Sequence, residues 1–320
     1  MISVIIPAYN ESAMIAKTSK VISDILEKSA IDYELIFVND GSKDMTWMEI
    51  VKAHEENKRV IGISFSRNFG KEAAMFAGLE KAQGACAVII DCDLQHPPEK
   101  IVEMYRLWEQ GYEVVEAVKD DRGKESRVHG FFANTFYKII GKATGLDMKN
   151  ASDFKLMDRR VVDVLNGMPE RSVFFRALST WVGFKSTKVT FSVREREEGT
   201  SKWSTKALVK YAISNITSFS AAPMQVITVL GCICLFFDFV FAIYSLIAWI
   251  TGGKIFAYTA LILVNTLLSG IIMVGIGILG YYTSKVYDEV KRRPRYIISS
   301  QLYTDDRNRK DNVNYENDNK

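Results

Sequence analysis

The sequence is poor in cysteine and histidine, with four cysteines and three histidines among 320 residues. Cys86 and Cys92 lie around a predicted strand, and Cys232 and Cys234 lie inside an apolar run. None of them has a histidine at metal-ligand spacing. We therefore expect neither a disulfide framework nor a zinc site, and we expect all four thiols to be reduced.

An excess of charge of one sign is also missing. The chain has 41 basic and 38 acidic residues, a net charge of +3. This balance does not favour nucleic acid binding, so we expect no nucleic acid partner. The first ten residues, MISVIIPAYN, lack a basic stretch and reach polar residues too soon for a signal peptide. We expect the first element to be a folded strand in the cytosol.

Charged residues are almost absent from two long segments, 224–250 and 255–284. Neither contains Lys, Arg or Glu, and Asp238 is the one charged residue in the pair. Each segment is long enough to cross a hydrocarbon core about 30 Å thick. We predict two transmembrane helices joined by a turn at 251–254. An unpaired charge at Asp238 would cost roughly 3 kcal/mol, so we expect this residue to face the second span or another protomer.

Basic residues lie on both outer flanks of this predicted hairpin, whereas its turn holds only Lys254. The positive-inside rule then predicts a multi-pass protein of the cell membrane, with the N-terminal part and the C-terminal tail in the cytosol. Residues 203–222 are predicted to form an amphipathic juxtamembrane helix in the headgroup layer, with an ordinary surface helix as the alternative. The tail, 285–320, is predicted to be basic and then disordered. The flanking basic residues are Lys202, Lys206 and Lys210 before the hairpin and Lys285, Lys291, Arg292, Arg293 and Arg295 after it.

The first half of the chain alternates short apolar runs with segments of helical periodicity. Nearly continuous apolar strands that alternate with helices are typical of a parallel sheet covered on both faces, so we predict an α/β fold. Ligands of such sheets bind at the carboxyl ends of the strands. The predicted strands are 4–6, 34–38, 60–65 and 87–90, then 114–118 and 188–193, and the first helices are 11–26, 44–56 and 71–82.

Two acids follow the fourth predicted strand, in the run Asp91-Cys92-Asp93. Carboxylates at this spacing at the edge of a sheet can hold a hard divalent cation. Such a cation could bridge to a diphosphate and offset the charge that grows as a nucleoside diphosphate leaves. The alternative is a solvated turn that happens to contain two acids.

The longer run from Asp91 to Glu99, DCDLQHPPE, resembles the metal-binding signature of family 2 glycosyltransferases of the polyprenyl-phosphate type. This group includes bactoprenol glucosyltransferases and dolichyl-phosphate mannose synthases. Further segments agree with that family in the same order: 6–11 with its first nucleotide loop, 38–42 with its second, 153–157 with its acceptor-site strand, and Arg196–Gly199 with Ser201 and Lys202 as its basic loop. The resemblance covers about 1–284.

The resemblance implies a GT-A nucleotide-diphospho-sugar transferase fold over 1–202, with a Rossmann-like, mainly parallel sheet. It implies an inverting transfer of a hexose, glucose-type, from a nucleotide-sugar (a UDP-sugar) to polyprenyl phosphate at the lipid bilayer, with Mg²⁺ or Mn²⁺ as cofactor. The implied metal site is Asp91, Asp93 and Gln95, and the implied catalytic residues are Asp153 and Asp93. Pro7, Tyr9, Glu11 and Asp40 are implied to surround the nucleoside, and Arg122, Arg127, Arg196 and Lys202 to contact phosphates.

The sequence departs from the family pattern at Cys92, Lys155 and Trp203. Lys155 stands where Arg is frequent, and a lysine is a point charge that cannot contact a phosphate in the bidentate manner of arginine. Asp153 occupies the position usually named the base. A phosphate monoester, whose second pKa is about 6, is already mostly dianionic near pH 7 and needs no base. We therefore predict that Asp153 orients a sugar hydroxyl or a basic acceptor-binding residue.

Two other functions remain open from the sequence. One is a processive polysaccharide synthase, for which two spans make a poor channel in one subunit. The other is a catalytically inactive membrane scaffold, against which the intact acids and basic loop argue. The sequence does not name the sugar. Gly270, Gly275, Gly277 and Gly280 allow close helix packing, so a homo-oligomer is open as well.

Overall fold

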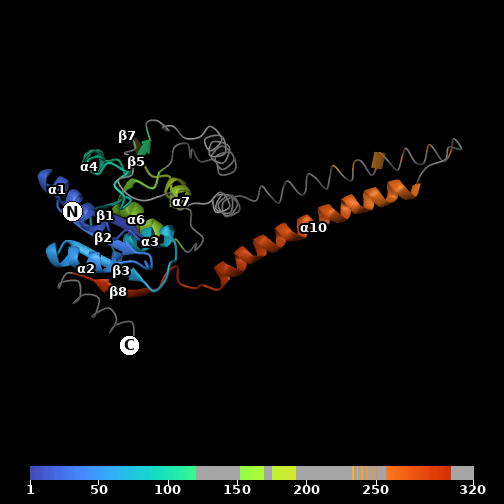
Figure 1. The fold of residues 1–320 in the computed structure, drawn as a ribbon. Coiled ribbons are helices and arrows are strands. Elements are labelled where there is room, and N and C mark those ends of the chain that lie inside the picture. The colour runs from blue at the N-terminus through green and yellow to red at the C-terminus, as the bar shows by residue number, and fades with distance from the viewer. Residues whose placement is uncertain are drawn as a thin grey trace, which may run out of the picture. The chain divides into compact units, whose positions relative to one another are not determined.

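The computed structural model describes residues 1–119, 152–168, 175–191 and 257–303, with isolated positions between 233 and 250 (Figure 1). The chain divides into two compact units. The first contains the sheet, its helices and the chain from Pro294 onward, and the second contains the long helix α10. The predicted helix 203–222, the loop residues 120–127 and Asp238 lie outside the described residues.

The first unit is built on an eight-stranded sheet with the order β7-β5-β6-β4-β1-β2-β3-β8. Its centre, β4-β1-β2-β3, is parallel, and β5 and β7 are also parallel to each other. β6 runs antiparallel to β4 and β5, and β8 runs antiparallel to β3. This confirms the predicted α/β fold with a mainly parallel sheet. The strands are β1 Ile2–Ala8, β2 Tyr33–Asn39, β3 Val60–Phe65, β4 Cys86–Ile89, β5 Val114–Lys119, β6 Lys155–Asp158, β7 Ser186–Phe191 and β8 Ile298–Leu302.

Helices cover both faces of this sheet because the strands are apolar on both faces. Along β1, Val4 and Ile6 belong to one core cluster and Ile5 belongs to the other. The first cluster is shared with α1 Ile15–Lys28, α2 Thr46–Glu56 and α4 Lys100–Glu109. The second is shared with α3 Lys71–Lys81, α6 Arg159–Asn166 and α7 Phe175–Trp181. All loops that follow the four central strands therefore open at one edge of the layered domain.

The chain beyond α10 adds the edge strand β8, which the sequence analysis missed. Ser299 Oγ donates to the carbonyl of Ser64 at 3.1 Å, and the ring of Tyr296 stacks on Phe65 with centroids 4.9 Å apart. β8 lies within the tail 285–320 that was predicted to be basic and then disordered, and that description of the tail stays a prediction. A strand of five residues, three of them polar, has too weak an apolar pattern to be recognised, and it is held by backbone pairing with β3.

The second unit contains α10, Ala257–Val290, which begins close to the predicted second span, 255–284, and ends beyond it. Its stretch Leu267–Tyr287 has the length and the apolar composition needed to cross a membrane, and no part of this stretch is buried. The predicted first span, 224–250, is described only at isolated positions, all of which are helical. Among the described residues, one helix thus qualifies as a membrane span.

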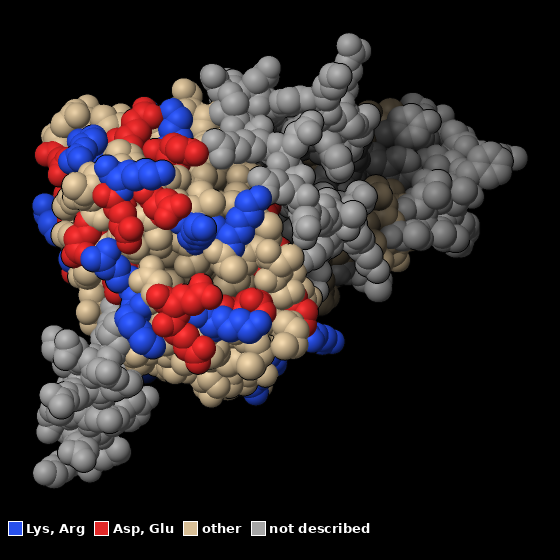
Figure 2. Space-filling model, turned by 60° about the vertical axis from the view of Figure 1, so that its left-hand side comes forward, with Lys and Arg blue, Asp and Glu red and all other residues tan. Residues whose placement is uncertain are grey.

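Figure 2 shows how charge is distributed over one face of the protein. Lys and Arg side chains lie among Asp and Glu side chains across the described part of this face. Charges of both signs are thus mixed there, in keeping with the near balance of basic and acidic residues in the sequence.

Candidate functional site

Loops after the first two strands are tied together by side chains. The backbone N–H of Asn10 donates to Ser42 Oγ, and the N–H of Lys43 donates to Asn10 Oδ1, both at 2.9 Å. The N–H of Glu11 donates to Thr46 Oγ1 at 2.9 Å. These bonds place the predicted nucleoside-binding loops side by side at the carboxyl edge of the sheet. Of the predicted residues, Pro7 lies within β1, paired with Val38, whereas Tyr9 and Glu11 follow that strand and are partly buried.

Asp40, buried after β2, anchors the loop that leads into α3. Its carboxylate accepts the N–H groups of Phe69 at 2.7 Å and of Gly70 at 3.0 Å. Burial raises the pKa of Asp40, and the two backbone hydrogen bonds partly offset that rise. Gly41 beside it has φ +64°, and a Cβ there would lie 2.2 Å from the carbonyl carbon of Arg67. Asp40 therefore stabilises the loop before α3, and its contact with a nucleoside stays a prediction.

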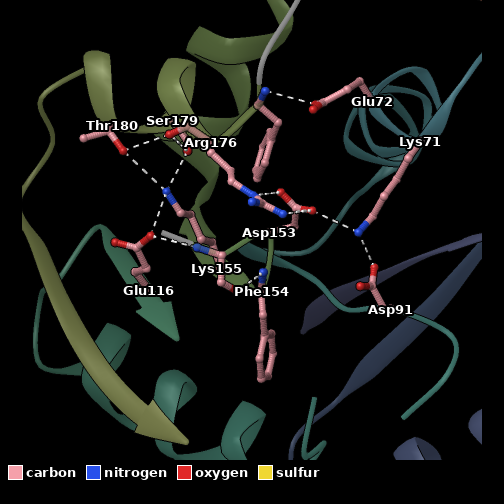
Figure 3. Close-up of polar contacts among 12 residues, drawn as sticks. Lys71, Glu72, Asp91, Glu116, Asp153, Phe154, Lys155, Arg176, Ser179 and Thr180 are labelled. Carbon is pink, nitrogen blue, oxygen red and sulfur yellow. Dashed lines mark hydrogen bonds and ion pairs between the residues drawn. The ribbon is translucent and has the colours of Figure 1, made fainter. Parts of the chain in front are cut away.

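Lys71, the first residue of α3, links two of the predicted acids (Figure 3). Its Nζ lies 2.6 Å from Asp91 Oδ1 and 2.9 Å from Asp153 Oδ2. Burial lowers the pKa of Lys71, but the two carboxylates outweigh it and leave the pKa above its ordinary value. For Asp91, burial raises the pKa and the Lys71 ammonium outweighs this, so the pKa lies below its usual value.

Asp153 lies at the same edge because β6 is antiparallel to β4, which sets the start of β6 beside the end of β4. Its side chain is 9% exposed and accepts two hydrogen bonds from Arg176, at 2.7 Å from Nε and 3.0 Å from Nη2. Burial raises the pKa of Asp153, but Arg176 and Lys71 hold it well below its usual range. A carboxylate held this way is a weak base and a strong anchor for cations.

Glu72, the next residue of α3, is a third acid at this cluster. Its Oε2 accepts the backbone N–H of Phe175 at 3.0 Å and so fixes the start of α7, which carries Arg176. Burial, followed by the charge of Asp153, raises the pKa of Glu72 to about 7. This carboxyl group therefore titrates near neutral pH.

Lys155 points away from these acids and into the domain (Figure 3). Its side chain is 1% exposed, and Nζ lies 3.2 Å from Glu116 Oε1 and 3.0 Å from Ser179 Oγ. Burial lowers the pKa of Lys155, with Glu116 acting against it. Lys155 thus forms a buried ion pair with Glu116, and its contacts join β5, β6 and α7.

The two acids of the predicted metal site follow β4. Asp93 Oδ1 accepts the backbone N–H of Gln95 at 3.1 Å, and Asp91 Oδ1 is paired with Lys71. The described residues contain no group of three or more His, Cys, Asp and Glu side chains arranged to hold a metal. Two carboxylates are nevertheless hard oxygen donors, and Asp91 already pairs with a cation. The residues fit Mg²⁺ or Mn²⁺ if a bound phosphate or water supplies the other ligands.

Comparison with known proteins finds relatives over most of the chain. The family model described as "Glycosyl transferase family 2" matches residues 3–165. An uncharacterized glycosyltransferase of Synechocystis is 38% identical over 93% of this chain and 94% of its own. A prophage-derived bactoprenol glucosyl transferase of Shigella flexneri is 36% identical over 93% of this chain and 97% of its own.

The chain belongs to glycosyltransferase family 2. It is a glycosyltransferase, and its sheet is the mainly parallel one of the GT-A fold. Among solved structures, glucosyl-3-phosphoglycerate synthase from Mycobacterium tuberculosis, in complex with Mn²⁺ and UDP-glucose, is 21% identical, with a TM-score of 0.47 over 68% of this chain and 77% of that one.

The structure of this family 2 glycosyltransferase brings most of the predicted site residues to one edge of the sheet. Four predicted phosphate contacts, Arg122, Arg127, Arg196 and Lys202, lie outside the described residues. Three charged residues of the cluster were not singled out from the sequence: Lys71, Glu72 and Arg176. Lys71 could have been found from the sequence, because it ends the polar loop after the third predicted strand. Arg176 lies on α7, for which the sequence has no comparable pattern.

Proposed function

We propose that this enzyme transfers glucose from a UDP-sugar to polyprenyl phosphate at the cytosolic face of the cell membrane. The observation that carries the proposal is the match to relatives named bactoprenol glucosyl transferase, which spans 93% of this chain. The matched length is far greater than the 3–165 of the family model, so the match continues past β6 toward α10.

In the proposed reaction, an oxygen of the lipid phosphate attacks the anomeric carbon of the sugar. The bond from that carbon to the diphosphate oxygen breaks on the opposite face, so the configuration inverts. The attacking phosphate needs no base near pH 7, and Asp153, whose pKa lies below its usual range, is poorly suited to be one. We assign Asp153 to the positioning of Lys71 and Arg176, with which it forms ion pairs and whose cationic groups would contact phosphates.

The remaining contacts of the proposal follow from the family resemblance. Asp91 and Asp93, with Gln95, would hold Mg²⁺ or Mn²⁺, which supplies neutralisation of the leaving diphosphate. Pro7, Tyr9, Glu11 and Asp40 would surround the nucleoside, and Arg122, Arg127, Arg196 and Lys202 would contact phosphates. The proximity of the β1, β2 and β4 loops supports this assignment.

We also propose that α10 and the segment 224–250 form a transmembrane hairpin, giving a multi-pass protein with both ends in the cytosol. The apolar, unburied stretch Leu267–Tyr287 supports the second span. Residues 203–222 would lie in the headgroup layer beside the acceptor, and glycines of α10 would allow a homo-oligomer.

The test is a transfer assay with the purified full-length protein, radiolabelled UDP-glucose, polyprenyl phosphate and Mg²⁺. The expected product is a radiolabelled lipid that extracts into organic solvent, is released by mild acid and is lost on chelation of the metal. Asp93→Asn should abolish the signal. A growing water-soluble polymer would support the polysaccharide synthase, and no transfer from any of a panel of nucleotide-sugars would support the scaffold.

A further inference from the structure

Asp91 already has a cation at one carboxylate oxygen, and that cation is part of the protein. Lys71 Nζ lies 2.6 Å from Asp91 Oδ1, a short charge-assisted contact (Figure 3). The other oxygen, Oδ2, lies 3.9 Å from His96 Nδ1, which is buried and lacks a hydrogen-bond partner among the described residues. The ammonium of Lys71 is thus the strongest described partner of Asp91.

The same ammonium is held a second time, by Asp153 Oδ2 at 2.9 Å. Asp153 is nearly buried and fixed by Arg176, so it does not depend on Lys71 for all of its neutralisation. The Lys71 side chain, by contrast, is 41% exposed and sits on four rotatable bonds. The Lys71 side chain can therefore move away from Asp91 while its ammonium stays paired with Asp153.

A divalent ion bound to Asp91 cannot share Oδ1 with Lys71 without close approach of two positive charges. We propose that Lys71 is a resident counter-cation of Asp91, that the divalent ion displaces it, and that the displaced ammonium then binds the diphosphate of the nucleotide while still paired with Asp153. Metal binding and nucleotide binding are coupled through this one lysine. The inference rests on the proposed function for the identity of the metal ligand and of the nucleotide.

The position of Lys71 in the fold suits this second role. It is the first residue of α3, an 11-residue helix that begins at the carboxyl edge of the sheet. The helix dipole favours phosphate at such an end, and the lysine adds a mobile positive charge. Asp40 fixes the loop just before it, so the lysine backbone is held in place while its side chain moves.

The test measures Mn²⁺ binding by electron paramagnetic resonance, with and without UDP, on the purified full-length protein. Lys71→Met keeps the length of the side chain and removes the charge. It should bind Mn²⁺ alone roughly fivefold or more tighter than wild type, because a competing cation is gone. With Mn²⁺ saturating, it should bind UDP at least about fivefold more weakly, because a phosphate partner is gone. The matched control is Lys52→Met, an exposed lysine of α2 paired with Glu49, which should change neither value.

Lys71→Arg should bind Mn²⁺ no more tightly than wild type, and Lys71→Gln should repeat Lys71→Met if the methionine variant is unstable in a thermal melt. Unchanged or weaker Mn²⁺ binding by the folded Met and Gln variants would overturn the displacement. Unchanged UDP affinity would overturn the phosphate role. Asp91→Asn separates the role of Lys71 from the proposed metal site. If Asp91→Asn binds Mn²⁺ like wild type, the metal assignment is wrong and the inference falls with it. If it loses Mn²⁺ binding, the metal assignment holds and the Lys71 variants decide the inference.

Discussion

Asp153→Asn distinguishes a base from an anchor at the centre of the site. The substitution keeps the shape of the side chain and removes its charge. In the native protein three short contacts converge on this carboxylate: 2.7 and 3.0 Å from Arg176 and 2.9 Å from Lys71. The side chain is 9% exposed, so water replaces little of what is lost.

The size of the effect can be worked from those contacts. Charge-assisted hydrogen bonds contribute about twice as much as neutral ones, so the amide costs about 1 kcal/mol per contact. Three contacts give at most about 3 kcal/mol, and each 1.36 kcal/mol is tenfold in rate. We expect transfer by Asp153→Asn to fall by about 10- to 100-fold, and transfer by Asp91→Asn to fall at least about tenfold further, because it removes a metal ligand.

The assay is the initial rate of glucosyl transfer to polyprenyl phosphate between pH 6 and 9, with a thermal melt to confirm folding. Burial raises the pKa of Asp153, but Arg176 and Lys71 outweigh it, so the carboxylate stays ionised across this range. The pH profile of the variant should therefore run parallel to that of wild type. A loss as large as that of Asp91→Asn, or a variant rate that rises about tenfold per pH unit as hydroxide replaces a missing base, would refute the anchor role.

Three further variants test the loop before α3, the acid cluster and the edge strand β8. Gly41→Ala should lower the free energy of unfolding by at least about 2 kcal/mol in urea, since φ is +64° and the new Cβ would lie 2.2 Å from Arg67. Glu72 has a folded pKa of about 7, above its ordinary 4.5, so wild-type stability should fall as pH rises from 4.5 to 7. Glu72→Gln should lack that fall and be more stable at pH 8 by on the order of 2 kcal/mol in thermal melts; equal pH slopes would contradict this. Tyr296→Ala should remove the stacking on Phe65, cost about 1–2 kcal/mol and speed hydrogen exchange in β8, with unchanged exchange as the contrary result.

The central strands could be predicted because they are buried on both faces, which makes each one a nearly continuous apolar run in the sequence. β3, Val60–Phe65, has the bounds that the sequence predicts, and all six residues are buried. β8 could not be predicted in the same way. It is an edge strand whose hydrogen bonds come from β3, some 235 residues earlier in the chain for Ser299 and Ser64. A local apolar pattern contains no information about such a partner.

The acids of the site could be predicted, but their partners could not. Asp91 and Asp93 are visible because they follow an apolar strand, and a parallel sheet directs strand ends to one edge. Arg176 lies on a seven-residue helix that comes beside Asp153 only through packing of α7 on the sheet. Lys155 shows the converse. It lies two residues after Asp153 in the sequence, which suggests the site, but its ammonium is buried and paired with Glu116 and Ser179.

The network in Figure 3 is balanced before any ligand binds, and this balance determines how it can bind ligands. Asp91 and Asp153 face Lys71 and Arg176, and burial and then the charge of Asp153 raise the pKa of the neighbouring Glu72. A divalent cation alone adds positive charge beside Lys71, and a diphosphate alone adds negative charge beside the acids. The cation and the diphosphate together restore the balance of charge if Lys71 moves from Asp91 to the diphosphate. The charges of the protein therefore favour joint binding of metal and nucleotide over binding of either one.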